Sequence, residues 1–277
     1  LYFASTTSPY KEKQAASTIA QVLNLDKQTF TVDFAGSLRS GTNALRAAMD
    51  AVNSGSAKNI LVCASDVRLG FPNGDREMEF GDGAAAFLIS SDKVSVTIEG
   101  SYSHYNEMMD VWRSDKDVYV RFWEDGFAYS QGYAKVVPEA ISAATKKYNL
   151  TPKDFSKLAI YAPNARQLGV VARSLGLDLK TQVQDVLHST VGNTGTAMAL
   201  ISLVAALEEV KAGDRLLLAS YGDGCDVFVL KVTEEIENIR TRRGIKGHLA
   251  SKQPLPGGYQ KYLRWRGQIE VEPPKRV

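Results

Sequence analysis

Cysteine and histidine are scarce in this chain: 277 residues include two cysteines, Cys63 and Cys225, and three histidines. Two cysteines this far apart provide neither a disulfide framework nor a CxxC metal pair. Neither His104 nor His248 has a further ligand at metal-binding spacing, so we expect no metal site. The sparing use of cysteine favours a reducing compartment, and we expect a cytoplasmic protein.

Long apolar runs are also missing. No run reaches the roughly 18 residues that cross a membrane, and the first residues lack the charged, apolar and small-residue order of a signal peptide. With 44% hydrophobic and 23% charged residues, the composition is that of a soluble globular protein with a sizeable core. We expect no contact with a membrane.

Charge is balanced overall, with a net charge of +2, but it is unevenly distributed. From Arg240 onward there are ten Lys or Arg residues against two Glu, which leaves 23 basic and 29 acidic residues before it. A basic tail of this kind can meet phosphates, an acidic partner, or only solvent. No nucleic-acid-binding motif accompanies it, so we expect no nucleic-acid partner.

The two halves of the chain repeat each other at a displacement of about 155 residues in the clearest pair. Ile60-Leu-Val-Cys-Ala-Ser65 is echoed by Leu216-Leu-Leu-Ala-Ser220, and Gly81-Asp-Gly-Ala-Ala-Ala-Phe-Leu-Ile89 by Gly222-Asp-Gly-Cys-Asp-Val-Phe-Val-Leu230. Each copy must be a packed supersecondary unit. The sequence therefore predicts a duplicated domain, with a ligand site where the halves meet.

Strand and helix patterns alternate along both halves. Strands are expected at 1–5, 30–34, 60–65, 84–90, 94–103, 157–161, 215–220 and 226–232, and helices at 11–25, 41–53, 133–148, 165–175 and 195–211. This alternation predicts α/β layers with mainly parallel strands. We divide the chain into a first half (1–98), a second half (99–235) with an insertion at 103–131 that caps the site, and a basic tail or linker (236–277). By the logic of the repeat, the first half is incomplete at its N-terminus.

Several motifs in these halves resemble the thiolase superfamily: Ser40-Gly-Thr-Asn-Ala-Leu45, Gly81 to Ile89, Val191-Gly-Asn-Thr194 and Tyr221-Gly-Asp-Gly224. Within it, Thr6-Thr-Ser-Pro-Tyr10, Ala64-Ser-Asp66 and Asp110-Val-Trp-Arg113 are similar to hydroxymethylglutaryl-CoA synthases of the archaeal type. The resemblance covers about residues 1–235. It implies a duplicated fold layered α-β-α-β-α around mixed, mainly parallel, five-stranded sheets.

The resemblance also implies partners. The substrate would be an acyl-CoA, with coenzyme A as part of the substrate and no tightly bound cofactor. A homodimer or a heteromeric assembly is implied. The tail, from Tyr262-Leu-Arg-Trp-Arg266 to Glu272-Pro-Pro274, resembles versions that continue into a zinc-ribbon/OB-fold partner domain. Such a module would lie beyond Val277 or on another polypeptide.

The expected catalytic set is mostly substituted. The superfamily reads Ala-Cys-x-x-Gly-Thr where this chain has Ser37-Leu-Arg-Ser-Gly-Thr42, so Leu38 occupies the nucleophile position. Tyr161 stands at the position of the histidine, and Thr7 at that of the synthase glutamate. Of the four, only the asparagine of the Gly-Asn motif, Asn193, remains. A leucine cannot form an acyl-enzyme, so the usual ping-pong condensation is not available through that residue.

The remaining candidates have two interpretations each. Tyr161 is either a core residue at a strand end or a phenol that exchanges a proton with a bound oxygen. Asn193 is an N-cap or an oxyanion donor. His188 is a loop histidine or a base in the pocket, and Cys225 is a small buried residue or a displaced nucleophile.

Four further residues are expected near the coenzyme. Arg39 and Ser40 follow Leu38 at a helix start, where their backbone N–H groups could bind an anion. Gly222 and Gly224 lie in the turn that borders the active site in the superfamily, and both are typical of a turn.

Three functions fit this pattern. The first is cysteine-independent aldol or retro-aldol chemistry on a CoA thioester, as in the steroid side-chain aldolases of the superfamily, which have tyrosine in place of cysteine. The second is a condensing acyltransferase with an unusual nucleophile, of the hydroxymethylglutaryl-CoA synthase or thiolase type. The third is a non-catalytic scaffold subunit of a complex with a zinc-ribbon/OB-fold partner.

Overall fold

A computed structural model describes residues 1–239, 244–254, 256–270 and 272. The first half forms one sheet with its helices; the elements in chain order are β1 (Tyr2–Ala4), α1 (Ala15–Val22), β2 (Val32–Phe34), α2 (Ser40–Asn53), β3 (Asn59–Val67), α3 (Asp75–Glu79) and β4 (Asp82–Ser90). Its strand order is β2-β1-β3-β4, in which only β4 runs antiparallel to its neighbour.

The second half forms the other main sheet. Its elements are β5 (Val96–Tyr105), β6 (Val111–Trp112), β7 (Arg121–Phe122), α4 (Asp125–Phe127), a π-helical turn (Ala128–Tyr133), α5 (Ala134–Lys147), a 3₁₀ turn (Pro152–Asp154), β8 (Lys157–Ile160), α6 (Ala165–Ser174), a 3₁₀ turn (Gly195–Ala197), α7 (Met198–Leu207), β9 (Arg215–Tyr221) and β10 (Gly224–Val232). The strand order is β5-β10-β9-β8, and β6 and β7 pair separately within the insertion.

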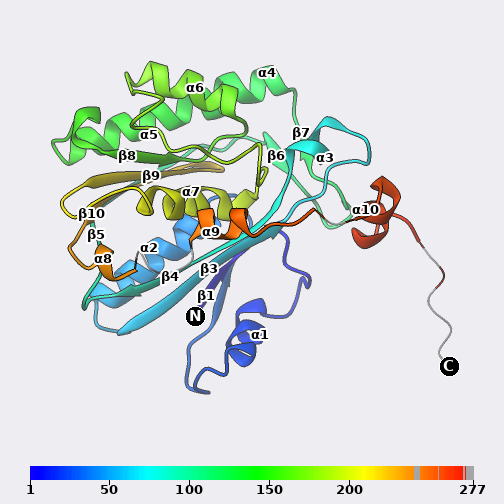
Figure 1. The fold of residues 1–277 in the computed structure, drawn as a ribbon, viewed down its shortest axis with the longest axis horizontal. Helices are drawn as coiled ribbons and strands as arrows, with labels where there is room; N and C mark the ends of the chain where they lie inside the picture. Colours follow the sequence, from blue (N-terminus) through cyan, green and yellow to red (C-terminus); the bar gives the residue numbers. More distant parts are fainter. Residues whose placement is uncertain (240–243, 255, 271, 273–277) are drawn as a thin grey trace.

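The strand pairing confirms the duplication. In the first half β1 runs parallel to β3, and β3 pairs antiparallel with β4. In the second half β8 runs parallel to β9, and β9 pairs antiparallel with β10. Figure 1 shows the resulting layers: α5 and α6 lie over the β8–β9–β10 sheet, α2 and α7 lie between the two sheets, and α1 covers the far side of the first sheet. The expected order α-β-α-β-α is thus present.

The expectation of five-stranded sheets is wrong: each main sheet has four strands in the described residues. In the second sheet, the fifth strand is reduced to a single parallel bridge between Leu158 and Val183. Only the backbone groups of Gln182 and Gln184 pair with Leu158, at 2.7 and 2.9 Å, before the chain leaves the edge. The first sheet has no counterpart of β5 among the described residues.

The central layer explains the sequence of α7. Met198–Leu207 is apolar on all sides, and most of its residues are buried, because the helix lies between two sheets. By contrast, α1 is shorter than the expected helix at 11–25. It begins at Ala15 because the carboxylate of Asp33, on β2, accepts hydrogen bonds from the N–H groups of Ala15 and Ala16 at 2.7 and 2.8 Å.

The described part of the tail contains three short helices and contacts the body. It contains α8 (Ile236–Ile239), α9 (Ile245–Ala250) and α10 (Tyr259–Trp265). Tyr259 donates a hydrogen bond to Glu77 at 2.7 Å, and Arg266 pairs with Asp82. Arg240 and the proline pair Pro273-Pro274 lie outside the described residues. Among the described helices, none has the length and apolar character needed to cross a membrane.

Candidate active site

A cavity of about 800 Å³ opens where the carboxyl ends of the parallel strands of both sheets meet. Thr7 lies just beyond β1, Arg68 just beyond β3 and Tyr161 just beyond β8, and all three line the cavity. Leu38, which follows β2, and Tyr221, at the end of β9, also line it. Ligand sites of α/β proteins form at this edge, so the expected location between the halves is where the cavity lies.

The insertion supplies another part of the cavity wall. Lining residues come from Glu107–Asp117 and from Val120, Phe122, Asp125, Ala128 and Tyr129. The capping role of 103–131 stays a prediction, which this position supports.

Tyr161 and Asn193 lie together in this cavity and are both almost completely buried. The Asn193 amide Nδ2 donates to the Tyr161 hydroxyl at 3.2 Å, and its Oδ1 accepts from the Arg68 guanidinium at 2.9 Å. Oδ1 also accepts from the N–H of Gly195 at 3.0 Å, which fixes the orientation of the amide. The result is a continuous hydrogen-bonded chain, Arg68–Asn193–Tyr161.

Burial raises the pKa of Tyr161 above its ordinary value of 10.0, while the nearby Arg68 charge opposes the shift. The side chain is therefore a phenol at neutral pH, able to donate a hydrogen bond to a bound oxygen. Tyr221, whose ring stacks on that of Tyr161, donates to Asp110 Oδ2 at 2.7 Å. Burial raises the pKa of Asp110 and that of Tyr221 as well.

Thr7, the residue at the glutamate position, has its side chain committed to the fold. Its hydroxyl donates to Asp66 Oδ1 at 3.2 Å and accepts from the N–H of Val67 at 2.9 Å. A threonine hydroxyl has no useful acidity near neutral pH, so this position supplies packing and hydrogen bonds rather than proton transfer.

Leu38 immediately precedes the start of α2 and presents an aliphatic side chain to the cavity. The two backbone N–H groups that follow are already used: Arg39 N donates to Ser37 Oγ at 3.4 Å and Ser40 N to the Ser37 carbonyl at 3.0 Å. Neither Arg39 nor Ser40 lines the cavity. A role for them in coenzyme binding stays a prediction, and these bonds favour a structural role.

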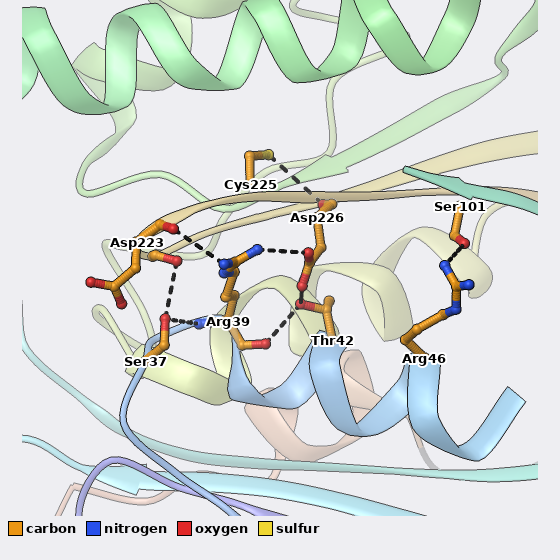
Figure 2. A network of polar contacts seen from close by, with 9 residues as sticks. Ser37, Arg39, Thr42, Arg46, Ser101, Asp223, Cys225 and Asp226 are labelled. Carbon is orange, nitrogen blue, oxygen red and sulfur yellow. Dashed lines mark hydrogen bonds and ion pairs between the residues drawn. The ribbon is translucent and has the colours of Figure 1, made fainter. Parts of the chain in front are cut away.

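The Arg39 side chain ties α2 to the turn between β9 and β10, as Figure 2 shows. Its guanidinium donates to Asp226 Oδ1 at 3.0 Å and to the Asp223 carbonyl at 3.2 Å. Thr42 donates to the other Asp226 oxygen at 2.8 Å. Because Asp226 is buried, this ion pair holds the two halves together at the base of the site.

Gly222 and Gly224 are required by close packing. A Cβ on Gly222 would lie 2.9 Å from Ser37 Oγ and 3.0 Å from Leu38 Cβ. A Cβ on Gly224, which has φ +124°, would lie 2.1 Å from the carbonyl oxygen of His104. Gly222 lines the cavity and Gly224 does not. Their coenzyme-binding role stays a prediction.

Cys225 lies on the opposite side of β10 from Asp226 and Arg39 (Figure 2). The residue is fully buried and does not line the cavity. Burial, reinforced by the Asp226 charge, raises the pKa of its thiol strongly. A thiol that is neither ionised nor accessible cannot attack a bound thioester, which favours the structural interpretation of this cysteine.

The two thiols should therefore differ in reactivity. In the folded protein we expect a disulfide reagent to react slowly with the half-buried Cys63, whose pKa is also raised by burial. Cys225 should react about 100-fold more slowly than in urea, because modification requires the structure to open. Thiol titration with peptide mapping, with and without urea, measures both rates. Rapid labelling of native Cys225 would contradict this assignment.

His188 does not line the cavity. Its Nε2 lies 3.0 Å from the Ala162 carbonyl, to which it must donate. Burial lowers its pKa, so the imidazole is neutral at pH 7. It supports the backbone just after Tyr161, and its role as a base in the pocket stays a prediction.

Three residues that line the cavity have no role that the sequence alone indicates: Arg68, Asp110 and Tyr221. Asp110 and Tyr221 belong to the motifs that carry the resemblance, but the motifs do not reveal that these two side chains meet. For Arg68, the available signal is its position two residues after Asp66 at the end of a predicted buried strand. Within the described residues, no group of three or more potential ligand side chains is arranged to hold a metal.

Comparison with known proteins agrees with this geometry. Residues 32–104 match the family 3-oxoacyl-[acyl-carrier-protein] synthase III, and residues 145–231 match its C-terminal counterpart. The fold and the cavity between its halves thus define a protein of the thiolase superfamily. The chain is 32% identical over 245 residues to the hydroxymethylglutaryl-CoA synthase of Pyrococcus horikoshii, covering 87% of this chain and 69% of that protein.

A second relative, the hydroxymethylglutaryl-CoA synthase of Aeropyrum pernix, is 30% identical over 275 residues, 98% of this chain and 75% of that protein. The chain therefore belongs to the hydroxymethylglutaryl-CoA synthase family. Among solved structures, MvaS in complex with 3-hydroxy-3-methylglutaryl coenzyme A matches all of this chain and 76% of that one, with a TM-score of 0.84 at 19% identity.

Proposed function

We propose that this protein binds a 3-hydroxyacyl thioester of coenzyme A in the cavity and makes or breaks its C2–C3 bond without an acyl-enzyme. One observation carries the proposal. The cavity has the unreactive Leu38 at the nucleophile position, and it also contains the hydrogen-bonded chain of Arg68, Asn193 and Tyr161. The scaffold of a condensing site and its asparagine are present, and the nucleophile is not.

The absence of a thiol from the cavity supports this chemistry. No cysteine lines the described cavity, and Cys225 lies fully buried outside it. Aldol cleavage needs only proton transfer and a stabilised enolate, whereas acyl transfer in this family needs a nucleophile.

Tyr161 would act on the oxygen at C3. In cleavage, the phenolate takes the hydroxyl proton, the C2–C3 bond breaks, a carbonyl forms at C3, and the electron pair moves to the thioester as an enolate. The enolate then takes a proton at C2 from the Tyr161 phenol, directly or through water, which regenerates the phenolate. In the reverse direction, the phenol protonates the forming alkoxide, and its raised pKa keeps the group protonated at neutral pH for this step. Asn193 holds the phenol oxygen in place by its 3.2 Å hydrogen bond.

The name of the structural relative supports the substrate class. That structure contains 3-hydroxy-3-methylglutaryl coenzyme A. This acyl-CoA carries a hydroxyl on C3, the carbon that becomes a carbonyl in aldol cleavage. The acyl group of the substrate of this chain need not be the same one, because several cavity residues come from the insertion.

The experiment is to incubate the purified protein with a panel of 3-hydroxyacyl-CoA thioesters and with acetyl-CoA. We expect release of an aldehyde or ketone together with a shortened acyl-CoA, both seen by mass spectrometry. We expect the intact protein mass to stay unchanged. A stoichiometric acyl adduct would instead establish acyl transfer with an unusual nucleophile. Neither binding nor turnover would point to a scaffold subunit.

We further propose that the protein acts in the cytoplasm as a homodimer or heteromer. We also propose that the C-terminal tail contacts a zinc-ribbon/OB-fold domain or subunit. The position of α10 supports a docking role for the tail, because its aromatic residues Tyr259, Tyr262 and Trp265 remain partly exposed. Measuring the size of the protein in solution, by itself and with candidate partner domains, tests the proposed assembly and the proposed tail contact.

A further inference from the structure

Arg68 is a buried cation without a carboxylate partner. Only 3% of the residue is exposed, and in the described residues it forms no ion pair, although the charge of Asp66 acts on it through space. Buried charges in proteins are normally paired or bound to a ligand, because leaving water is costly for an ion. The environment of Arg68 is therefore incomplete unless an anion enters the cavity that it lines.

The neighbours of Arg68 are already engaged with other groups. Asp66 is the nearest source of negative charge, but its two oxygens already accept five hydrogen bonds from Ser5, Thr6, Thr7 and Thr196. One guanidinium nitrogen donates to the neutral amide oxygen of Asn193. The face of the guanidinium packs on Phe80, with 4.1 Å from Cζ to the ring centroid.

Packing on Phe80 does not block hydrogen bonding at the edge of the guanidinium. Stacking uses the face of the group, whereas its N–H groups point outward in the plane. One nitrogen donates to Asn193 and the Tyr161 hydroxyl also interacts with the group, so the N–H groups that these two contacts do not use can donate to a ligand oxygen. Arg68 remains cationic at neutral pH, although burial lowers its pKa and the Arg76 charge adds to this. Asp66 and Tyr161 act in the opposite direction.

We propose that Arg68 is a catalytic residue that binds the thioester oxygen and neutralises the negative charge formed there when the C2–C3 bond breaks. This inference rests on the proposed function. The pair of electrons from that bond moves into the enolate, whose oxygen becomes an anion beside the guanidinium. Tyr161 handles the proton at the C3 oxygen, and Asn193 holds both groups at fixed positions. Preorganised donors of this kind are often the largest contribution to catalysis.

The test uses two stable coenzyme A derivatives of similar size. Carboxymethyl-CoA has a carboxylate that resembles a thioester enolate, and acetonyl-CoA has a neutral ketone in its place. Calorimetry on the wild-type protein should show that carboxymethyl-CoA binds at least about 10-fold more tightly than acetonyl-CoA, as expected for a charge-assisted hydrogen bond. In Arg68→Gln the two ligands should bind within about twofold of each other.

Two further variants make the experiment specific. Arg68→Lys should retain part of the preference, because a lysine keeps the charge but not the planar donor edge. Arg76→Gln is the matched control: Arg76 also lines the cavity, but it is paired with Glu79 and Asp125, each at 2.5 Å. It should retain the full preference. Thermal unfolding of each variant verifies folding.

The outcomes separate this inference from the proposed function. If the wild-type protein binds both derivatives equally, the inference about Arg68 is wrong, and the site for CoA thioesters stands. If neither derivative binds, the proposed function fails and the inference fails with it. If Arg68→Gln still preferred carboxymethyl-CoA, another group would bind the carboxylate, and this result would also overturn the inference. The wild-type measurement decides even if a variant does not fold.

Discussion

Tyr161→Phe is expected to reduce the rate of aldol cleavage by about 10²–10⁴-fold, the usual contribution of a positioned acid or base. The substitution removes one oxygen and keeps the ring, which is buried at the end of β8 and stacked on Tyr221. Binding of the coenzyme should change little, because the substitution removes a single oxygen that is proposed to act at C3 of the acyl group and not on the coenzyme. Steady-state assays should therefore show a fall in kcat with a nearly constant KM.

The pH dependence provides an independent check. Burial raises the pKa of Tyr161 above 10.0, and cleavage requires the phenolate, so the cleavage rate should rise with pH throughout the neutral and mildly alkaline range. The same shift favours the folded state below pH 10 and is lost as pH rises through the folded-state pKa, so assays belong below pH 10. The small residual activity of Tyr161→Phe should not follow this rise.

Cys225→Ala serves as the control, because it changes a buried thiol outside the cavity. It should retain most of the activity. If Cys225→Ala abolished turnover while Tyr161→Phe left it intact, cysteine-independent cleavage would be ruled out.

The sequence predicted those parts of the fold that depend on local pattern. The helix expected at 41–53 is α2 (Ser40–Asn53), and the strands expected at 60–65 and 84–90 are β3 and β4, but β4 is an edge strand and is not buried as expected: Leu88 is 66% exposed. Continuous apolar runs and the repeated Gly-Asp-Gly turns specify these elements without reference to distant residues. The cavity lies where the repeat places the candidate site, because equivalent strand ends of the two copies face each other.

Features that depend on distant partners could not be predicted. The start of α1 is set by Asp33, 18 residues beyond Ala15. The commitment of Arg39 to Asp226 spans 187 residues, and no local pattern distinguishes it from an anion-binding arginine. The same holds for Arg68, whose contact with Asn193, 125 residues away, exists only once the halves are packed. A motif identifies a candidate residue, but its role depends on tertiary contacts that the local sequence does not show.

Asp66 shows how strongly these long-range contacts can matter. It lies near the end of β3 with 1% of its surface exposed. Its Oδ1 accepts hydrogen bonds from the Ser5 hydroxyl at 2.9 Å and the Thr6 N–H at 2.7 Å. Its Oδ2 accepts from the Thr6 hydroxyl at 2.9 Å and from the N–H of Thr196, in the second half, at 2.8 Å. One carboxylate therefore joins β1, β3 and the segment that precedes α7.

Asp66→Ala is expected to lower the free energy of unfolding by about 3–5 kcal/mol, because several buried donors would lose their only charged acceptor. The substitution also removes the negative charge closest to the buried Arg68, which adds to the cost. Urea denaturation followed by circular dichroism measures the change. The loss for Asp66→Asn should be intermediate. The amide keeps one acceptor oxygen, but its NH₂ group would face other hydrogen-bond donors.

Asp50→Ala is the matched control for Asp66→Ala. Asp50 pairs with Arg46 at 2.9 Å on α2, but its side chain is 56% exposed. Removing such a surface pair should cost less than about 1 kcal/mol. Similar losses for the two variants would mean that the Asp66 contacts do not join the halves. A large loss at Asp66 alone would show that the polar groups beneath the cavity also hold the fold together. The substitutions at Leu38 and Tyr161 then change the chemistry of the site while this supporting framework stays in place.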